Sequence, residues 1–195
     1  MLVAVRGAMA IFDSEADISV LYVLTALCFA DVLSGAAFER DYAALEWYQE
    51  ARRYTRVTKR LPAWLFGVVW SALYVLFITA LYLVYNAPTP VYGRTLDIIA
   101  LAALVEIVLN KLWSPVFFTL HAPWVALFVV VAMNALNGLI LAYMWYGAFY
   151  PQAFWVYVPY AAWCLFALVL NAEWLWAESR LRHKQRCQAA PVVVV

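Results

Sequence analysis

Charged side chains are scarce in this sequence. Lys, Arg, Asp and Glu make up 13% of its 195 residues, and the formal net charge is +1. A typical soluble domain is about 25% charged. So few charges, with almost no excess of either sign, give no basis for a nucleic-acid partner, and none is expected.

Metal-binding and cross-linking residues are also few. The three cysteines, Cys28, Cys164 and Cys187, are an odd number without the spacing of a metal site or a disulfide framework. The two histidines, His121 and His183, are far apart and near no carboxylate cluster. No metal site or required cofactor is therefore predicted.

Catalytic motifs are missing as well. The sequence contains no nucleophile paired with a base, no phosphate-binding loop and no paired carboxylates, so we do not expect an enzyme. A cleavable signal peptide is not expected either, because the short apolar start is followed by Asp13, Glu15 and Asp17 rather than by a small-residue cleavage site. Residues 1–17 are predicted to be a short N-terminal segment.

Apolar residues, in contrast, make up 68% of the chain. A membrane-spanning helix needs about 20 mainly apolar residues, and breakers or polar stretches separate five such segments. The sequence therefore predicts an all-α integral membrane protein, a five-transmembrane-helix bundle over residues 18–176 that is followed by a basic tail, residues 177–195. Three connections are short, which makes consecutive helices antiparallel neighbours. The five predicted helices cover residues 18–38, 63–85, 96–120, 124–146 and 154–176.

Basic residues predict the orientation of this bundle. Cytoplasmic flanks of membrane helices carry an excess of Lys and Arg. The side that holds loop one (residues 39–60), the third loop and the C-terminus has ten basic residues, and the opposite side has two. Loop one and the C-terminus are therefore predicted to be cytoplasmic. The pattern fits a bacterial membrane, an endomembrane or the mitochondrial outer membrane equally.

The third predicted helix carries a polar and aromatic stripe. Glu106, Asn110, Trp113 and Phe117 are spaced by four, three and four residues, which places them on one face. A carboxyl group inside a membrane is costly and should face the bundle interior with a partner, so Glu106 is a functional candidate by default. The alternative is a protonated Glu106 that only forms a packing hydrogen bond with a neighbouring helix.

The fifth predicted helix carries a second stripe, with a small residue in it. Ala167 lies beside Trp163, Leu170 and Asn171 on one face and would leave a gap where a flat ligand could lie. Close helix packing is the alternative, since small residues also let membrane helices approach. Glu173, near the end of this helix, is expected to form a structural ion pair with Lys111.

Three motifs along the chain resemble one family. Residues 61–74 read LPAWLFGVVWSALY, residues 109–118 read LNKLWSPVFF and residues 159–171 read PYAAWCLFALVLN. They are similar to the patterns P-x-W-x-F-G-x-V-W-x-x-L-Y, L-N-x-x-W-S-P-x-F-F and P-Y-x-x-W-x-x-F-A-x-x-L-N of helices two, three and five in the TspO/translocator protein family. Their order and spacing agree, and the resemblance runs from about residue 47 to residue 171.

The resemblance implies a function. Relatives bind porphyrins such as protoporphyrin IX, haem intermediates or sterols, for transport, scavenging or sensing, and the expected site is a cavity that opens toward loop one. It also implies that Trp70 and Tyr74 of the second helix line this cavity with the two stripes. The apolar composition itself makes a lipid bilayer the main expected partner. Porphyrin breakdown has been proposed for bacterial members, but the loop-one tryptophan implicated there is not matched in this chain.

Two departures from the family pattern affect these expectations. Glu106 stands where the family usually has Gln. Helix three lacks the G-x-x-x-G of the family's proposed dimer contact, so the homodimer that the resemblance implies has no sequence signal of its own. A rival hypothesis is a membrane scaffold or regulatory protein that acts on protein partners or anionic lipid through its basic loop and tail.

Overall fold

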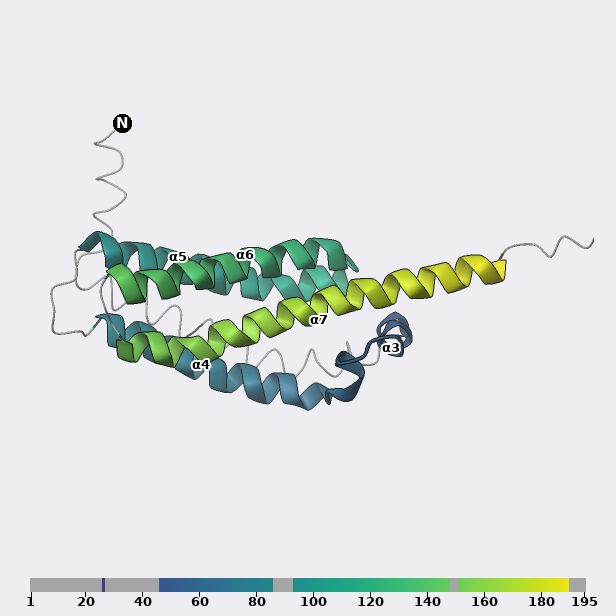
Figure 1. Cartoon of the computed structure of the whole chain (residues 1–195), viewed down its shortest axis with the longest axis horizontal. Helices are drawn as coiled ribbons and strands as arrows, with labels where there is room; N and C mark the ends of the chain where they lie inside the picture. The colour runs from purple at the N-terminus through teal and green to yellow at the C-terminus, as the bar shows by residue number, and fades with distance from the viewer. Residues whose placement is uncertain (1–25, 27–45, 86–92, 148–150, 190–195) are drawn as a thin grey trace, which may run out of the picture.

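The computed structural model describes residues 26, 46–85, 93–147 and 151–189 of the chain, and throughout this part the ordered elements are helices (Figure 1). Two short elements belong to loop one, and four long helices follow. The elements are α3 (Glu46–Arg52), η1 (Thr58–Arg60), α4 (Ala63–Tyr85), α5 (Gly93–Ser114), η2 (Pro115–Thr119), α6 (Pro123–Ala142), η3 (Tyr143–Gly147) and α7 (Pro151–Ala189).

Four helices are long and apolar enough to cross a membrane: Trp64–Tyr85, Ile98–Thr119, Pro123–Tyr146 and Pro151–Cys187. They correspond to the second to fifth predicted spans, and α4 has the bounds that the sequence predicts. The predicted first span, residues 18–38, lies outside the described residues except for residue 26. The all-helical class and the membrane location are therefore confirmed, while the count of five spans stays a prediction.

The long helices form a bundle in which α6 lies between α5 and α7, and α7 also packs along α4. Aromatic, aliphatic and small side chains fill the centre, among them Phe77, Ala103, Ile107 and Tyr157. The outward faces remain apolar, as a lipid-facing surface requires. Exposed examples are Val68, Leu101, Phe128, Trp155 and Val169.

The ends of two helices differ from a regular α-helix. A single π-helical segment continues α5 over Pro115–Thr119, where proline cannot donate to the regular ladder. A second one follows α6 over Tyr143–Gly147. Between η2 and α6, His121 has a positive φ of 49°, a conformation in which His is enriched, and this residue turns the chain into α6.

The last helix is longer than the predicted span. Residues 154–176 lie within α7, but the helix continues to Ala189 and has 39 residues. At 1.5 Å per residue its length is roughly 58 Å, about twice the thickness of the hydrocarbon core. Glu178 and Arg182 support the extension through an ion pair of 2.6 Å between successive turns. The last turns of α7 therefore project beyond α5 and α6 (Figure 1).

Candidate ligand-binding site

A buried chain of hydrogen bonds connects three helices at the centre of the bundle. The Tyr74 hydroxyl of α4 donates to Asn110 Oδ1 of α5 at 2.7 Å. The Asn110 amide donates to the Tyr160 hydroxyl of α7 at 3.3 Å, and that hydroxyl donates to Glu106 Oε2 of α5 at 2.7 Å. All four side chains are buried. Hydrogen bonds between buried polar groups hold α4, α5 and α7 in fixed register.

Glu106 has its partners on a neighbouring helix. Besides Tyr160, the Cys164 thiol of α7 lies 4.0 Å from Glu106 Oε1. Within the part of the chain that the structure describes, no basic side chain forms an ion pair with Glu106. This geometry matches the packing hydrogen bond that was the alternative interpretation of Glu106.

Aromatic side chains line the seam between α4 and α7 next to this chain. Trp70 stacks on Tyr74, with 5.6 Å between ring centroids, and meets Trp163 edge-on at 6.4 Å. Phe66 and Phe166 lie 6.0 and 5.2 Å from the Trp163 ring. Phe66, Trp70, Trp163 and Phe166 are only partly buried. The seam therefore offers aromatic surface that the protein core does not fully cover.

Ala167 and Leu170 continue this surface along α7. They lie one and two turns beyond Trp163, toward loop one, and both are partly buried. Neither belongs to the buried core of the bundle. The small side chain of Ala167 thus stands where the aromatic seam approaches loop one.

The remaining predicted residues form a separate group at the loop-one end. The Trp113 indole donates to Asn171 Oδ1 at 3.0 Å, and the Asn171 amide donates to the Pro123 carbonyl at 3.2 Å. Trp113 also stacks on Phe117, with 5.1 Å between centroids. Asn171 therefore connects α7 to α5 and to the first turn of α6. The ten predicted site residues are therefore divided among the buried hydrogen-bond chain, the α4–α7 seam and this group.

The first helix of loop one covers that group. Trp47 of α3 lies 6.0 Å from Phe117 and 5.6 Å from Trp174, and Tyr48 stacks on Trp174 with 4.6 Å between centroids. Ala51, 1% exposed, completes the contact. The buried indole N–H groups of Trp47 and Trp174 have no acceptor among the described residues. Loop one thus lies over the ends of the helices and covers two hydrogen-bond donors that the described residues leave without an acceptor.

Glu173 attaches the rest of loop one to α7. Its Oε1 accepts the backbone N–H groups of Arg56 and Val57, the second at 2.8 Å, and its Oε2 accepts the Thr58 N–H at 3.1 Å and the Thr58 hydroxyl at 2.9 Å. The expected ion pair between Glu173 and Lys111 is therefore wrong. Both carboxylate oxygens accept hydrogen bonds from the start of η1 and the residues before it, whereas the Lys111 ammonium lies 5.3 Å from the centre of the Tyr74 ring.

Several residues of the site were missed at the sequence level. Tyr160 lies within the third motif but was not selected, although it connects Asn110 to Glu106. Tyr157, Tyr160 and Cys164 are spaced by three and four residues and are all fully buried. Polar groups at this spacing on the helix that also carries Trp163 were the available signal.

These features define a multi-pass helical membrane protein with a polar core, an aromatic seam and a loop that covers one end. The sequence matches the TspO/MBR family over residues 20–177. The chain therefore belongs to the TspO/MBR family.

Similar proteins support this membership. A tryptophan-rich sensory protein of Cereibacter sphaeroides is 30% identical over 160 residues, which cover 80% of this chain and 90% of the relative. The tryptophan-rich protein TspO of Archaeoglobus fulgidus is 31% identical over 110 residues, 56% of this chain and 67% of the relative. The protein CrtK of Rhodobacter capsulatus is 30% identical over 135 residues, 64% of this chain and 74% of the relative. No solved structure gives a significant match.

Proposed function

We propose that this protein binds a flat, largely apolar ligand, a tetrapyrrole (a porphyrin or haem intermediate) in the first place or a sterol, at the α4–α7 seam inside the membrane. Such binding would serve transport, scavenging or sensing. The observation that carries the proposal is the row of partly buried aromatic rings, Trp70, Trp163 and Phe166, that leads to the small Ala167.

The physical properties of the seam favour a planar ligand. Aromatic rings prefer stacked or edge-on contacts, which are worth about 0.5–1.5 kcal/mol beyond the area they bury. The hydrogen bond from Tyr74 to Asn110 fixes the ring on which Trp70 stacks, so the aromatic wall is held in place before a ligand arrives. Preorganised sites lose less entropy on binding.

Polar groups near the loop-one end suit the periphery of such a ligand. The buried indole N–H groups of Trp47 and Trp174 have no acceptor among the described residues, and carbonyl or carboxylate oxygens, or bridging water, satisfy such groups. A tetrapyrrole combines an apolar ring with carboxylate substituents. A ligand body along Trp163 to Leu170 with its polar edge toward loop one uses both kinds of surface.

A titration in lipid nanodiscs tests this proposal. Protoporphyrin IX should bind saturably, with a shift of its main absorbance band and quenching of protein fluorescence. Trp163→Ala should weaken the affinity roughly tenfold or more. Trp124→Ala is the matched control, because Trp124 is 62% exposed on α6 and away from the seam. Equal affinity of both variants and the wild type would place the porphyrin elsewhere, and absence of saturable binding would reject the tetrapyrrole. Competition by cholesterol tests the sterol arm.

A scaffold function is the second candidate, and the long α7 favours it. This helix carries Arg180, Arg182, Lys184 and Arg186 beyond the predicted membrane span, and all four are exposed. A projecting basic helix can attract acidic protein partners. A scaffold would keep its partners and lose none of its activity in Trp163→Ala, which separates it from a ligand-binding protein.

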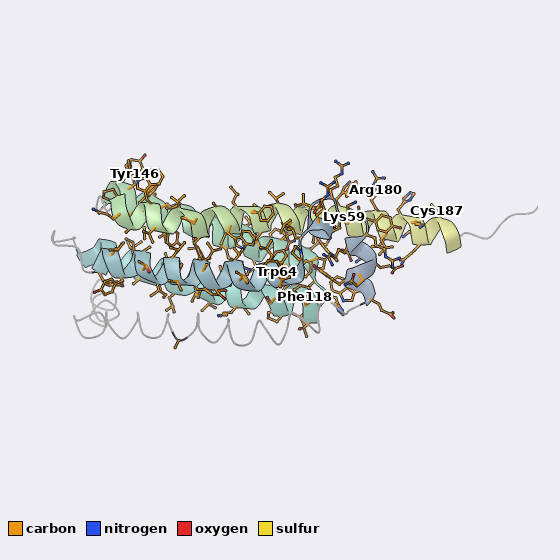
Figure 2. All side chains as sticks on the ribbon, turned by 90° about the horizontal axis from the view of Figure 1, so that it is seen from below. Lys59, Trp64, Phe118, Tyr146, Arg180 and Cys187 are labelled. Carbon is orange, nitrogen blue, oxygen red and sulfur yellow. The ribbon has the colours of Figure 1, made fainter. Side chains whose placement is uncertain are left out.

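We also propose that loop one and the C-terminus face the cytoplasm. Figure 2 places Lys59 of loop one and Arg180 of α7 at the same end of the bundle and Tyr146 at the other. The excess of basic residues at that end supports the orientation.

A further inference from the structure

An open hollow lies outside the bundle where loop one meets α7. It has a volume of about 300 Å³, and Arg56, Glu173 and Trp176 line it. The Trp176 ring is 42% exposed. The hollow faces outward, on the side of α7 opposite to Ala167, because nine residues at 100° per residue separate Ala167 from Trp176 by half a turn. It is therefore distinct from the α4–α7 seam.

The hollow has an excess of positive charge. The guanidinium carbons of Arg56 and Arg180 lie 5.6 and 4.8 Å from the centroid of the Trp176 ring. Neither guanidinium forms an ion pair in the described part of the chain, whereas nearby Arg182 pairs with Glu178. Glu173, the one carboxylate that the described residues place at the hollow, accepts backbone N–H groups of loop one but keeps its charge, so Arg56, Arg180 and Glu173 together carry one net positive charge.

Two guanidinium groups on one ring repel each other unless an anion lies between them or near them. Guanidinium groups bind phosphate oxygens through paired hydrogen bonds, and an indole ring stabilises the cations through its face. Arg56, Arg180 and Trp176 therefore fit a phosphate group that sits next to an apolar chain.

The depth of the hollow indicates where that phosphate comes from. On α7, Asn171 and Glu173 interrupt the apolar sequence, Trp174, Leu175 and Trp176 are its last large apolar residues before a charged stretch, and Glu178, Arg180 and Arg182 follow. Tryptophan is enriched where a helix leaves the hydrocarbon core and enters the headgroup region. The hollow thus lies at the level of lipid headgroups.

We propose that this hollow is a binding site for one anionic phospholipid, with Arg56 and Arg180 donating to its phosphate and Trp176 packing against its glycerol and upper acyl chain. The proposal does not depend on the ligand of the seam. The phosphate of the bound lipid balances the one net positive charge of Arg56, Arg180 and Glu173, and it attaches Arg56, and through it loop one, to the membrane surface. This is a specific site and not only the general attraction of basic residues to an anionic leaflet.

Native mass spectrometry tests the site on the full chain, exchanged into nanodiscs of phosphatidylcholine with increasing phosphatidylglycerol. The wild type should retain one phosphatidylglycerol. Arg56→Gln and Arg180→Gln should each weaken its retention about tenfold, the effect expected for loss of a charge-assisted hydrogen-bonded pair. Arg53→Gln and Arg186→Gln remove the same charge from exposed positions of loop one and α7 without a contact to Trp176, and should change retention less than about twofold.

Two results would overturn the proposal. Equal losses in all four variants would mean that the lipid is attracted by diffuse charge and that the hollow is not a site. Displacement of the lipid by millimolar inorganic phosphate, with no difference between lipid and free phosphate in affinity, would assign the hollow to a soluble anion. Phosphatidylglycerol with brominated acyl chains gives a second readout, because it should quench the fluorescence that Trp176→Phe removes.

Discussion

Glu173 holds loop one against α7, and its substitution gives a sharp test of how this end of the protein is closed. In Glu173→Gln an amide nitrogen, which is a donor, replaces one of the two oxygens. Each oxygen accepts two donors, from Arg56 and Val57 or from the two groups of Thr58. At least two of the four hydrogen bonds are therefore lost, together with the charge.

The size of the effect follows from the exposure of these groups. A typical intramolecular hydrogen bond contributes about 0.5–1.5 kcal/mol net, and bonds to charged groups contribute more. Because part of this contact is exposed, water replaces part of the loss, and the total is about 2 kcal/mol. This corresponds to an increase of roughly thirtyfold in the open population of loop one.

Limited trypsin digestion in detergent or nanodiscs measures that population. Exposed cleavage sites lie next to the residues that Glu173 binds: Arg53, Arg56, Lys59 and Arg60. Cleavage of a locally opened segment follows its equilibrium population when opening is fast relative to cutting. Glu178→Gln is the control, since it removes the same charge from α7 but breaks only an exposed pair with a value of about 0–1 kcal/mol. Equal cleavage rates in the two variants would show that Glu173 does not hold loop one against α7.

Three further outcomes are expected. Glu106→Gln should leave the melting temperature and porphyrin affinity nearly unchanged, because the Tyr160 hydroxyl can donate to an amide oxygen as well; a large loss of affinity would show that charge on Glu106 is used. Tyr74→Phe should destabilise the bundle by about 1–3 kcal/mol in thermal melting, because buried Asn110 loses its donor. An unchanged melting temperature would show that the buried hydrogen-bond chain does not stabilise the bundle. In sealed vesicles, a tag after Val195 and the trypsin sites of loop one should be accessible from the same, cytoplasmic side, and access from opposite sides would contradict the topology.

Hydropathy and breakers were sufficient to predict most of the fold. The predicted span 63–85 coincides with α4, since an apolar run bounded by prolines leaves little freedom in the placement of a membrane helix. The extension of α7 to Ala189 was not predicted. Most residues of this extension are polar, so the hydropathy pattern predicts that the span ends at the membrane surface. Helix propensity and the pair between Glu178 and Arg182 continue the helix in water.

The site was predicted less completely, because helical periodicity gives the faces of single helices but not which faces meet. The stripe from Glu106 to Phe117 is divided in the structure. Glu106 and Asn110 form hydrogen bonds with Tyr160, whereas Trp113 and Phe117 lie in the group that loop one covers. The hydrogen bond from Tyr160 to Glu106 joins segments about 50 residues apart in the chain, and the hydrogen bonds of Glu173 to loop one join segments more than 100 residues apart. Such contacts leave no local pattern in one sequence.

The most direct test of the proposed binding site is the porphyrin affinity of Ala167→Leu in nanodiscs. The added side chain should fill the space beside Trp163 that a flat ligand needs, while Ala167 lies outside the buried core and its replacement costs little stability. Ala162→Leu is the matched control, because Ala162 is exposed on the same helix. We expect at least a tenfold loss of affinity in Ala167→Leu, wild-type affinity in Ala162→Leu and similar melting temperatures for both. Wild-type affinity in Ala167→Leu would contradict a ligand at the α4–α7 seam.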